Sequence, residues 1–299
     1  MKRALALGFF DGVHIGHAVL LNRTVSLAEE LGLSPSVLSF DIHPDTLVFH
    51  SDLKLIGDAS SRKELISRLF GIEDVIFLHF SKSVMEMPWD EFLENITEEL
   101  DVAAIVAGYD FSFGAGGTGN PEKLTAWCRE HGLVCEIVPK IELDGKTVSS
   151  TYIRSLIEEG NMEEAWRYLG HPHCLSDTVH AGYHIGRKLD APTINLFFPP
   201  NVLVPKYGVY ATKVILSDGG EYEAVTNVGV RPTVSEENKL SVESHLLNYS
   251  GNLYGMPARV DFYKFLRPEM KFESFEALGK QIKEDAEETH RYFCQTQEA

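Results

Sequence analysis

Hydrophobic and polar positions change their pattern near residue 170 of this 299-residue chain. Before that point, short apolar runs alternate with stretches in which apolar residues recur every three or four positions. The short runs are typical of buried strands, and the recurring pattern is typical of amphipathic helices. Strands that alternate with helices predict a parallel sheet covered by helices on both faces.

The first part of the chain therefore predicts a layered α/β domain. We expect strands at 4–10, 35–41, 74–80, 102–111 and 133–139, and helices at 16–32, 60–72, 87–100, 121–132 and 150–170. In open parallel sheets, ligands bind beyond the carboxyl ends of the strands. The sequences GFFDGVHIGH, SFDIHP and AGYDFSFG lie at such ends, so we expect a binding site there.

The second part of the chain has a different pattern. From about residue 177, short β segments alternate with turn sequences such as SDGGE and NYSGNLYG. We expect strands at 193–199, 208–216, 222–230, 240–249 and 258–266, followed by a helix at 274–293. This order predicts a small antiparallel barrel with a C-terminal helix. The sequence HPHC at 171–174 is interpreted as a linker between domains rather than as a metal site.

Charge and cysteine usage narrow the class of partner and the compartment. The formal net charge is −17, and the longest basic run is GRK at 186–188. Such a surface repels nucleic acid and anionic membranes, and no apolar window approaches the roughly 18 residues of a membrane span. The four cysteines form no CxxC pair, which favours reduced thiols in a cytoplasmic protein.

The sequence GFFDGVHIGH places His14 and His17 where the first strand turns into a helix. A helix N-terminus binds anions through its free N–H groups, and two imidazoles add donors for phosphate oxygens. Gly12 and Gly16 allow the backbone to approach a ligand closely. This arrangement suits attack on the α-phosphorus of a nucleoside triphosphate. The alternative is a pair of ordinary histidines that cap a helix.

Two further motifs carry groups that bind phosphate or metal. In VSSTYIR, Ser150 and Thr151 offer donors at a helix start and Arg154 offers a cationic fork; a simple N-cap is the alternative. In APTINL, Thr193 and Asn195 are two apart on a strand and face the same side. Their oxygens can hold Mg²⁺ beside ATP phosphates.

These motifs resemble those of a known family. HxGH after a first strand is the signature of the nucleotidyltransferase superfamily. The strings GFFDGVHIGH, SFDIHP, GYDFSFG and VSSTYIR are similar to those of the bacterial bifunctional riboflavin kinase/FMN adenylyltransferases, or FAD synthetases. The resemblance spans nearly the whole chain. It implies an α/β plus β fold, with a nucleotidyltransferase-type parallel-sheet domain at 1–170 and an antiparallel β-barrel flavokinase domain with a C-terminal helix at 171–299.

The resemblance also implies roles for residues of the first domain. His14, His17 and Arg154 would act on ATP during adenylyl transfer. The remaining residues would bind ATP and its phosphates (Gly8, Phe10, Gly16, Ser150 and Thr151) or the flavin (Asp11, His43 and Asp110). For Asp11, His43 and Asp110, the alternative is that the side chain has a structural role and does not bind the flavin.

In the second domain, Glu243 matches the family's general base; the alternative is a strand glutamate that faces solvent. The other matches would bind ATP (Gly182, Gly186 and Arg187), the flavin (Asn227, Arg231 and Arg267) or Mg²⁺ (Thr193 and Asn195). Asn227 and Arg231 have bracing of the barrel loops as their alternative. His184 and Asp190 depart from the family pattern, because many members have glycine at position 184 and LGFPT or LGYPT where this chain has LDAPT.

The sequence thus predicts an enzyme that phosphorylates riboflavin to FMN and adenylylates FMN to FAD, with ATP as co-substrate and Mg²⁺ as cofactor. One alternative is an FMN adenylyltransferase whose kinase domain is degenerate. A second is a flavin-binding regulatory protein that contacts RNA. Riboflavin, FMN, FAD and ATP are the expected partners, without nucleic acid or membrane, and the pattern does not predict an oligomeric state.

Overall fold

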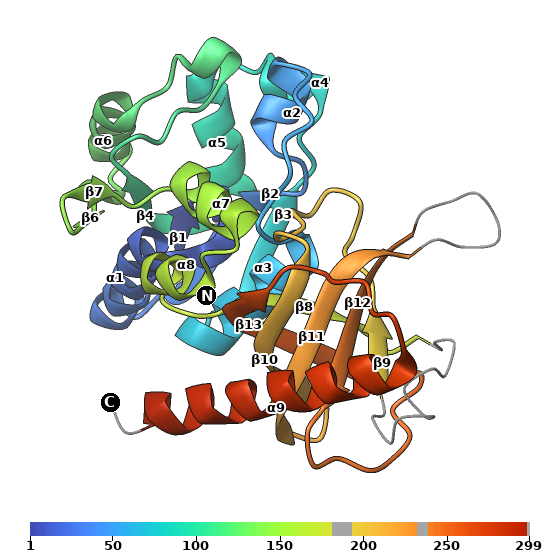
Figure 1. The fold of residues 1–299 in the computed structure, drawn as a ribbon. Helices are drawn as coiled ribbons and strands as arrows, with labels where there is room; N and C mark the ends of the chain where they lie inside the picture. Colours follow the sequence, from blue (N-terminus) through green and yellow to red (C-terminus); the bar gives the residue numbers. More distant parts are fainter. Residues whose placement is uncertain (181–192, 232–238, 298–299) are drawn as a thin grey trace. The chain divides into compact units, whose positions relative to one another are not determined.

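The chain folds into two compact units, Met1–Ser150 and Thr151–Ala299 (Figure 1). The computed structural model describes residues 1–180, 193–231 and 239–297. The two units are called the first unit and the second unit below, and each is described by itself.

The first unit is built on a five-stranded sheet in the order β3-β2-β1-β4-β5, with all neighbouring strands parallel. Its strands are β1 (Arg3–Leu7), β2 (Ser34–Phe40), β3 (Asp74–Leu78), β4 (Val102–Gly108) and β5 (Val134–Val138). All five strands expected from the sequence are confirmed. Strand order reverses direction at β1, so a ligand crevice is expected beyond the carboxyl ends of β1 and β4.

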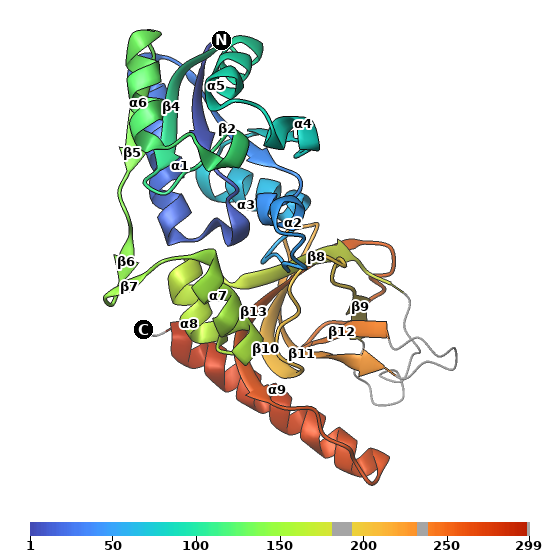
Figure 2. The ribbon, with the colours of Figure 1, turned by 90° about the horizontal axis from the view of Figure 1, so that it is seen from above.

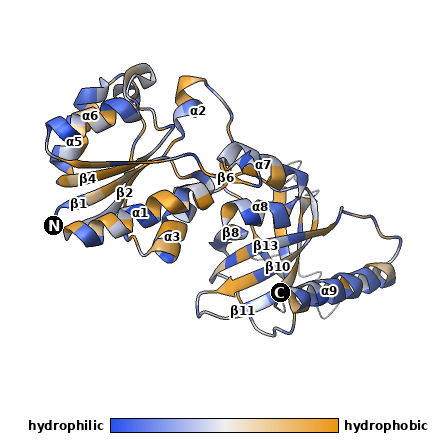
Figure 3. Ribbon diagram, turned by 90° about the vertical axis from the view of Figure 1, so that its left-hand side faces the viewer, coloured by the Kyte–Doolittle hydropathy of each residue, from blue (hydrophilic) through white to orange (hydrophobic). Residues whose placement is uncertain are grey.

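Helices cover both faces of this sheet, with α1 and α3 on one face and α5 and α6 on the other (Figure 3). The α-helices of the first unit are α1 (Ile15–Leu31), α2 (Pro44–Val48), α3 (Ala59–Phe70), α4 (Lys82–Met85), α5 (Trp89–Glu99) and α6 (Pro121–Glu130). Two short 3₁₀ turns, η1 (Asp11–Val13) and η2 (Ala115–Gly117), lie in loops. Residues Ala4, Leu5, Ala6 and Ile105 of the central strands are completely buried, as expected for a sheet covered on both faces.

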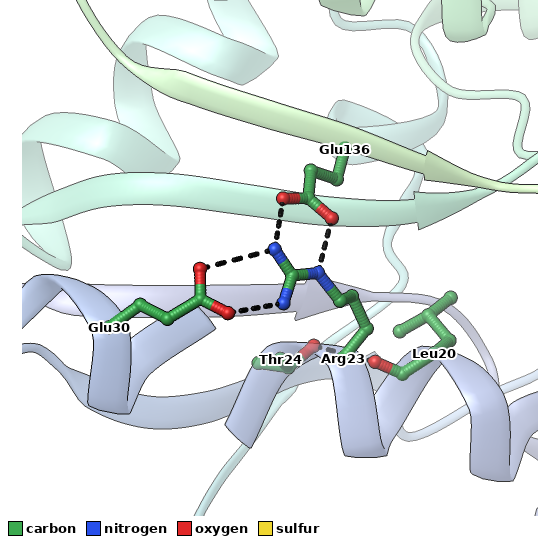
Figure 4. Close-up of polar contacts among 5 residues, drawn as sticks. All are labelled: Leu20, Arg23, Thr24, Glu30 and Glu136. Carbon is green, nitrogen blue, oxygen red and sulfur yellow. Dashed lines mark hydrogen bonds and ion pairs between the residues drawn. The ribbon is translucent and has the colours of Figure 1, made fainter. Parts of the chain in front are cut away.

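One side chain ties α1 to the edge of the sheet. Arg23 donates from Nε and Nη2 to the carboxylate of Glu136 on β5, at 2.5 and 2.6 Å, and its other donors reach Glu30 of α1 (Figure 4). The network is partly exposed, so its contribution to stability is small. It orients α1, which carries the two histidines at its N-terminus.

The first unit also contains a two-stranded hairpin that the sequence analysis does not include. It consists of β6 (Glu142–Leu143) and β7 (Lys146–Thr147). Asp144 and Gly145 at the turn both have positive φ, at 52° and 74°, which is the geometry of a type I′ hairpin turn.

The second unit begins with two helices, the second of which packs on its sheet. They are α7 (Ser150–Glu159), which starts at the last residue of the first unit, and α8 (Met162–Leu169). Between them, Gly160 lies against Lys206 and Phe265, and α8 contacts two strands. The two units are divided after Ser150, whereas the domain boundary expected from the sequence is at 170, which stays a prediction.

The sheet of the second unit has six strands in the order β8-β13-β10-β11-β12-β9, all antiparallel. They are β8 (His173–Thr178), β9 (Thr193–Leu196), β10 (Gly208–Leu216), β11 (Glu221–Arg231), β12 (Lys239–Leu246) and β13 (Pro257–Arg267). β9 to β13 confirm the expected strands. The linker interpretation of HPHC is wrong, because His173 starts β8 and is 2% exposed.

The sheet curls into a half-barrel, and a long helix crosses it. A bridge between His180 and Asn195 brings the two edges of the sheet together. The helix α9 (Phe275–Gln297) lies across β10 and β11 (Figure 2). The expected C-terminal helix is therefore confirmed, and it covers one face of the curled sheet.

Candidate active sites

The first candidate site is the turn that joins β1 to α1. His14 is the N-cap of α1, and its Nδ1 accepts a hydrogen bond from the backbone N–H of His17 at 3.2 Å. Phe10 and Val13 have positive φ, at 60° and 44°. This conformation is strained for side chains other than glycine, so the surrounding structure must hold the turn in place.

The two histidine rings are stacked on each other, with 3.5 Å between their centroids and 13° between their planes. Burial, the neighbouring His14 and the charge of Arg62 together hold the pKa of His17 well below its usual value. Within the described parts of the chain, the buried Nδ1 of His17 has no hydrogen-bond partner. His17 therefore presents a neutral imidazole beside a helix N-terminus.

Ser150, the last residue of the first unit, contacts the same turn. The hydroxyl of Ser150 donates to the carbonyl of Asp11 at 3.0 Å. A side chain at Gly16 would meet the ring of His14 at 3.1 Å and Val148 at 3.8 Å. The structure therefore places Ser150 next to the histidine turn; its role in phosphate binding stays a prediction. Thr151 lies in the first turn of α7 and Arg154 in the next, at the start of the second unit.

The other predicted residues of the first unit have mixed surroundings. Asp11 is 2% exposed and its carboxylate accepts from the backbone N–H groups of Ile56 and Gly57. His43 is the N-cap of α2, and its ring contacts Phe9 edge to face at 4.4 Å. Asp110 is exposed just after β4. The structural alternative considered for Asp11 and His43 is thus visible in their contacts.

Gly8 and Phe10 are packed against each other at the end of β1. A Cβ at Gly8 would lie 2.9 Å from the Phe10 ring, and Phe10 is 1% exposed. The Phe10 ring meets His17 edge to face at 5.3 Å. Phe10 thus packs against His17, and Gly8 leaves room for the Phe10 ring.

One residue of this region was missed by the sequence analysis. Arg62 of α3 is completely buried, and it donates to the backbone carbonyls of Phe9 and Phe40, which lie at the carboxyl ends of two strands. An arginine in a polar helix sequence gives no sign of burial, so the sequence pattern offers no signal for this contact.

The second candidate site is a row of residues across five strands of the half-barrel. Asn195 of β9 pairs with Glu243 of β12, Glu243 pairs with Asn227 of β11, and Asn227 pairs with Val209 of β10, which pairs with Arg267 of β13. Residues paired directly across strands point to the same face of a sheet. Four residues predicted separately therefore share one row and one face.

Thr193 joins this face because it lies two positions before Asn195 on β9. Asn195 is 4% exposed, and Glu243 is partly buried. The hydroxyl of Ser241 lies 3.5 Å from Glu243 Oε1. Hydroxyl, amide and carboxylate oxygens are thus gathered at one end of the row.

Asn227 is held by a residue that the sequence analysis missed. Its Nδ2 donates to Oε1 of Glu269 at 3.1 Å. Glu269 lies so close to the backbone of Gly229 that a Cβ there would be 2.0 Å from the same oxygen. Because the amide nitrogen of Asn227 faces Glu269, its amide oxygen is directed elsewhere as an acceptor.

Arg267 is held by α9. Its Nε and Nη2 donate to the two carboxylate oxygens of Asp285 at 2.9 and 2.7 Å, and Nη1 donates to the carbonyl of Pro268. The Asp285 side chain is 5% exposed. A bidentate pair of this kind is a strong and specific contact. The donors of Arg267 therefore anchor α9 to the end of the row.

Several predicted residues lie outside the part of the chain that the structure describes. Gly182, Gly186 and Arg187 fall in the segment 181–192. Arg231 is the last residue of β11, and its side chain is not among those described.

Comparison with known proteins divides the chain in the same order as the two candidate sites. A family model described as FAD synthetase matches residues 1–152, which is half of the chain. A second model, described as Riboflavin kinase, matches residues 169–293. The histidine turn lies within the first match, and the row from Asn195 to Arg267 lies within the second.

Relatives match along almost the full length. The chain is 32% identical to the bifunctional riboflavin kinase/FMN adenylyltransferase of Listeria monocytogenes, over 100% of this chain and 95% of the relative. It is 32% identical to the protein of the same description from Bacillus subtilis, over 98% and 93%. The Escherichia coli K12 protein of that description is 30% identical, over 99% and 94%.

A solved structure has the same fold throughout. It is described as a macrolide-efflux protein from Streptococcus pneumoniae, and it matches with a TM-score of 0.84 and 29% identity, over 97% of this chain and 94% of that one. In the residues described here, no helix combines the length and the apolar character that a membrane crossing requires.

Both halves of the chain thus match an enzymatic family model, which does not favour a degenerate kinase domain. Full-length relatives at 30% identity or more carry both activities in their description. The chain therefore belongs to the family of bifunctional riboflavin kinase/FMN adenylyltransferases, which phosphorylate riboflavin to FMN and adenylylate FMN to FAD.

Proposed function

We propose that the two reactions use separate sets of residues, with the histidine turn serving FMN adenylylation and the row on the half-barrel serving riboflavin phosphorylation. The observation that carries this proposal is the row itself. Asn195, Glu243 and Asn227 are consecutive cross-strand partners, so three residues matched to the kinase chemistry share one face of one sheet.

In the kinase reaction, Glu243 acts as general base. Its carboxylate takes the proton of the terminal ribityl hydroxyl of riboflavin, and the oxygen attacks the γ-phosphorus of ATP. The bond from this phosphorus to the bridging oxygen breaks, and ADP leaves. Asn227 and Arg231 would contact the flavin. Arg267, which is paired with Asp285, would also bind the flavin, at its end of the row. Gly182, Gly186 and Arg187 would bind ATP.

The oxygens of Thr193 and Asn195 fit a hard cation such as Mg²⁺. Both residues lie on one face of β9, and Asn195 is paired with the carboxylate-bearing Glu243. Neutral and anionic oxygens are the ligands that Mg²⁺ takes in proteins, beside ATP phosphates. When bound, the ion supplies charge neutralisation at the phosphates. The side chains of Thr193 and Asn195 would hold the ion and the ATP phosphates next to the other residues of the row.

In the adenylyl transfer, a phosphate oxygen of FMN attacks the α-phosphorus of ATP and pyrophosphate leaves. Nδ1 of His14 accepts a hydrogen bond, so a neutral His14 carries its proton on Nε2, from which it can donate to a phosphate oxygen. His17, Ser150, Thr151 and Arg154 add donors to the same phosphates. Asp11, His43 and Asp110 would line the flavin side. Donors placed where charge develops stabilise the transition state without a covalent intermediate.

We also propose that the enzyme works in the cytoplasm. Cys128, Cys135, Cys174 and Cys294, all within the described residues, form no disulfide, which is the usual state in a reducing compartment. The net charge of −17 opposes binding to nucleic acid and to anionic membranes.

The test separates the two steps by substitution. Glu243→Gln should abolish FMN formation from riboflavin and spare FAD formation from FMN, and His17→Ala should do the reverse. Each variant is incubated with ATP, Mg²⁺ and either riboflavin or FMN, and the flavins are separated by chromatography. Glu221→Gln, an exposed strand glutamate paired with Lys213, and His50→Asn, an exposed histidine, are controls that should retain both steps. Loss of both steps in one well-folded variant would contradict the proposal.

A further inference from the structure

Arg62 of α3 is a buried charge whose donors go to the ends of two strands. Its guanidinium Nη1 donates to the carbonyl of Phe9 at 2.5 Å and to the hydroxyl of Ser39 at 2.7 Å, and Nη2 donates to the carbonyl of Phe40 at 2.9 Å. Ser39 in turn donates to the Phe9 carbonyl at 2.9 Å. One side chain therefore connects the carboxyl ends of β1 and β2.

The guanidinium is also enclosed by aromatic rings. Its central carbon lies 4.0 Å from the centre of the Phe9 ring and 5.2 Å from the centre of the Phe77 ring. Such cation–π contacts favour a guanidinium over an ammonium group. The Phe9 ring also contacts His43, so the Arg62 position is coupled to the predicted flavin side.

A second contact from the same region of the chain holds the other end of the turn. The carboxylate of Asp11 accepts from the N–H groups of Ile56 and Gly57, just before Asp58 caps α3. The strained residues Phe10 and Val13 lie on either side of Asp11, and Phe10 directly follows Phe9. Strained backbone persists only where its surroundings over-determine it, and α3 with its leading residues supplies that restraint.

Burying the charged side chain of Arg62 costs free energy, and an apolar side chain could fill the same space without that cost. Burial lowers the pKa of Arg62 to about 10, against the opposing effects of Asp11, Asp58 and Asp41, so the group stays charged near neutral pH. In the described portion of the chain, its Nε is buried without a hydrogen-bond partner. A buried cation is expensive compared with an apolar side chain of similar volume, which indicates that its donors and charge are used.

We propose that Arg62 is a positioning residue for FMN adenylylation, which clamps the ends of β1 and β2 so that His14 and His17 are held at the N-terminus of α1. The inference rests on the proposed role of the two histidines. Arg62 acts through the backbone of Phe9 and through its charge near His17, and it does not itself contact the reacting phosphates. Displacement of a catalytic group by about 1 Å costs on the order of 100-fold in rate.

The first test compares Arg62→Met and Arg62→Lys with wild type. Arg62→Met keeps the approximate volume and removes the charge and the donors, so kcat for FMN adenylylation should fall by about 10- to 100-fold with a small change in KM. Arg62→Lys keeps the charge but not the planar fork, and it should lie between the two. Riboflavin phosphorylation in the same sample should stay within about twofold, as evidence of a folded chain. Arg68→Met, an exposed arginine of the same helix, is the matched control.

The second test is chemical rescue. Arg62→Ala leaves a cavity next to the carbonyls of Phe9 and Phe40, into which free guanidinium can donate. Guanidinium chloride at sub-denaturing concentration should restore part of the adenylylation rate, whereas NaCl or urea at the same concentration should not. A purely structural deletion would not show this selectivity.

The outcomes distinguish this inference from the proposed function. If His14→Ala and His17→Ala retain FAD formation, the proposed function fails and the inference with it. If those variants lose FAD formation but Arg62→Met retains it, the inference alone is overturned. Equal loss of both activities in Arg62→Met, together with no selective rescue of Arg62→Ala, would also overturn it, because Arg62 would then serve the fold in general.

Discussion

The rings of His14 and His17 lie face to face, 3.5 Å apart between centroids. Protonation of both would place two like charges in contact, and burial opposes even one. The pair is therefore suited to donate hydrogen bonds as neutral groups rather than to neutralise phosphate as cations. This property sets the pH behaviour of the first site.

We expect His17 to stay neutral as pH falls from about 8 to 6, because its pKa is held below the ordinary value of about 6.5 by burial, His14 and Arg62. The measurement is NMR of the labelled imidazoles during a pH titration of the folded protein. The exposed His50 serves as an internal reference in the same spectra. A midpoint for His17 at or above that of an ordinary histidine would contradict the neutral pair.

Acid should destabilise the second unit through His173. This ring is 2% exposed and lies near Phe198 and Phe262, and burial, with a smaller effect of His171, lowers its pKa to about 3. The unfolded chain binds a proton near pH 6.5 and the folded chain does not, so stability is lost as pH falls below about 6.5. Between about pH 7.5 and 5.5 the loss should be about 1.4 kcal/mol.

The check is urea unfolding at both pH values for wild type and His173→Phe. The variant cannot take up this proton, so its stability should fall by about 1.4 kcal/mol less than that of wild type over the same range. His50→Asn should behave as wild type. Equal losses in wild type and His173→Phe would show that His173 is not held neutral.

The pair between Arg267 and Asp285 should be important for the attachment of α9. Its side chains are 17% and 5% exposed, so Arg267→Met leaves a buried carboxylate and should cost about 3 kcal/mol of unfolding free energy. Arg267→Met combined with Asp285→Leu should recover most of this loss, because both charges are then absent. Urea unfolding of the three proteins measures the effect. A single variant as stable as wild type would contradict this account of the pair.

The contact between Gly229 and Glu269 should control riboflavin phosphorylation. Gly229→Ala places a Cβ 2.0 Å from Oε1 of Glu269, so the glutamate must move and release Asn227. We expect kcat/KM for riboflavin to fall by on the order of tenfold, with FMN adenylylation unchanged as the control.

A double-variant comparison isolates this cause. In a Glu269→Ala background the carboxylate is absent, so Gly229→Ala should add little to the loss already present. If the alanine at position 229 costs as much in that background as in wild type, the effect arises elsewhere in β11.

The expected strands are present because short apolar runs, such as those of β1 and β4, suit buried strands of the first unit, and mixed apolar and polar segments between turn sequences, such as β11 and β12, suit strands of the second. β8 was missed because His173–Thr178 contains mostly polar residues, and its burial alternates at the edge of the sheet. The periodicity of residues 150–170 predicts helices there. It does not reveal that Gly160, between α7 and α8, lies against Phe265.

The candidate sites could be predicted from the sequence only where their residues lie in local motifs. His14, His17 and Glu243 lie in local motifs, and the motif order pointed to the family. Arg62 and Glu269 act on residues far away in sequence, Phe9 and Asn227, so their roles appear only when the chain is folded. The cross-strand register that aligns Asn195 with Glu243 is likewise a property of the assembled sheet.

The most direct test of two independent sites is a mixing experiment. Glu243→Gln alone should form neither FMN nor FAD from riboflavin, and His17→Ala alone should stop at FMN. A mixture of the two variants with riboflavin, ATP and Mg²⁺ should form FAD, because FMN made by one is adenylylated by the other. If the mixture forms no FAD, or if either variant loses both steps while folded, the separation of the two reactions between the histidine turn and the half-barrel row is wrong.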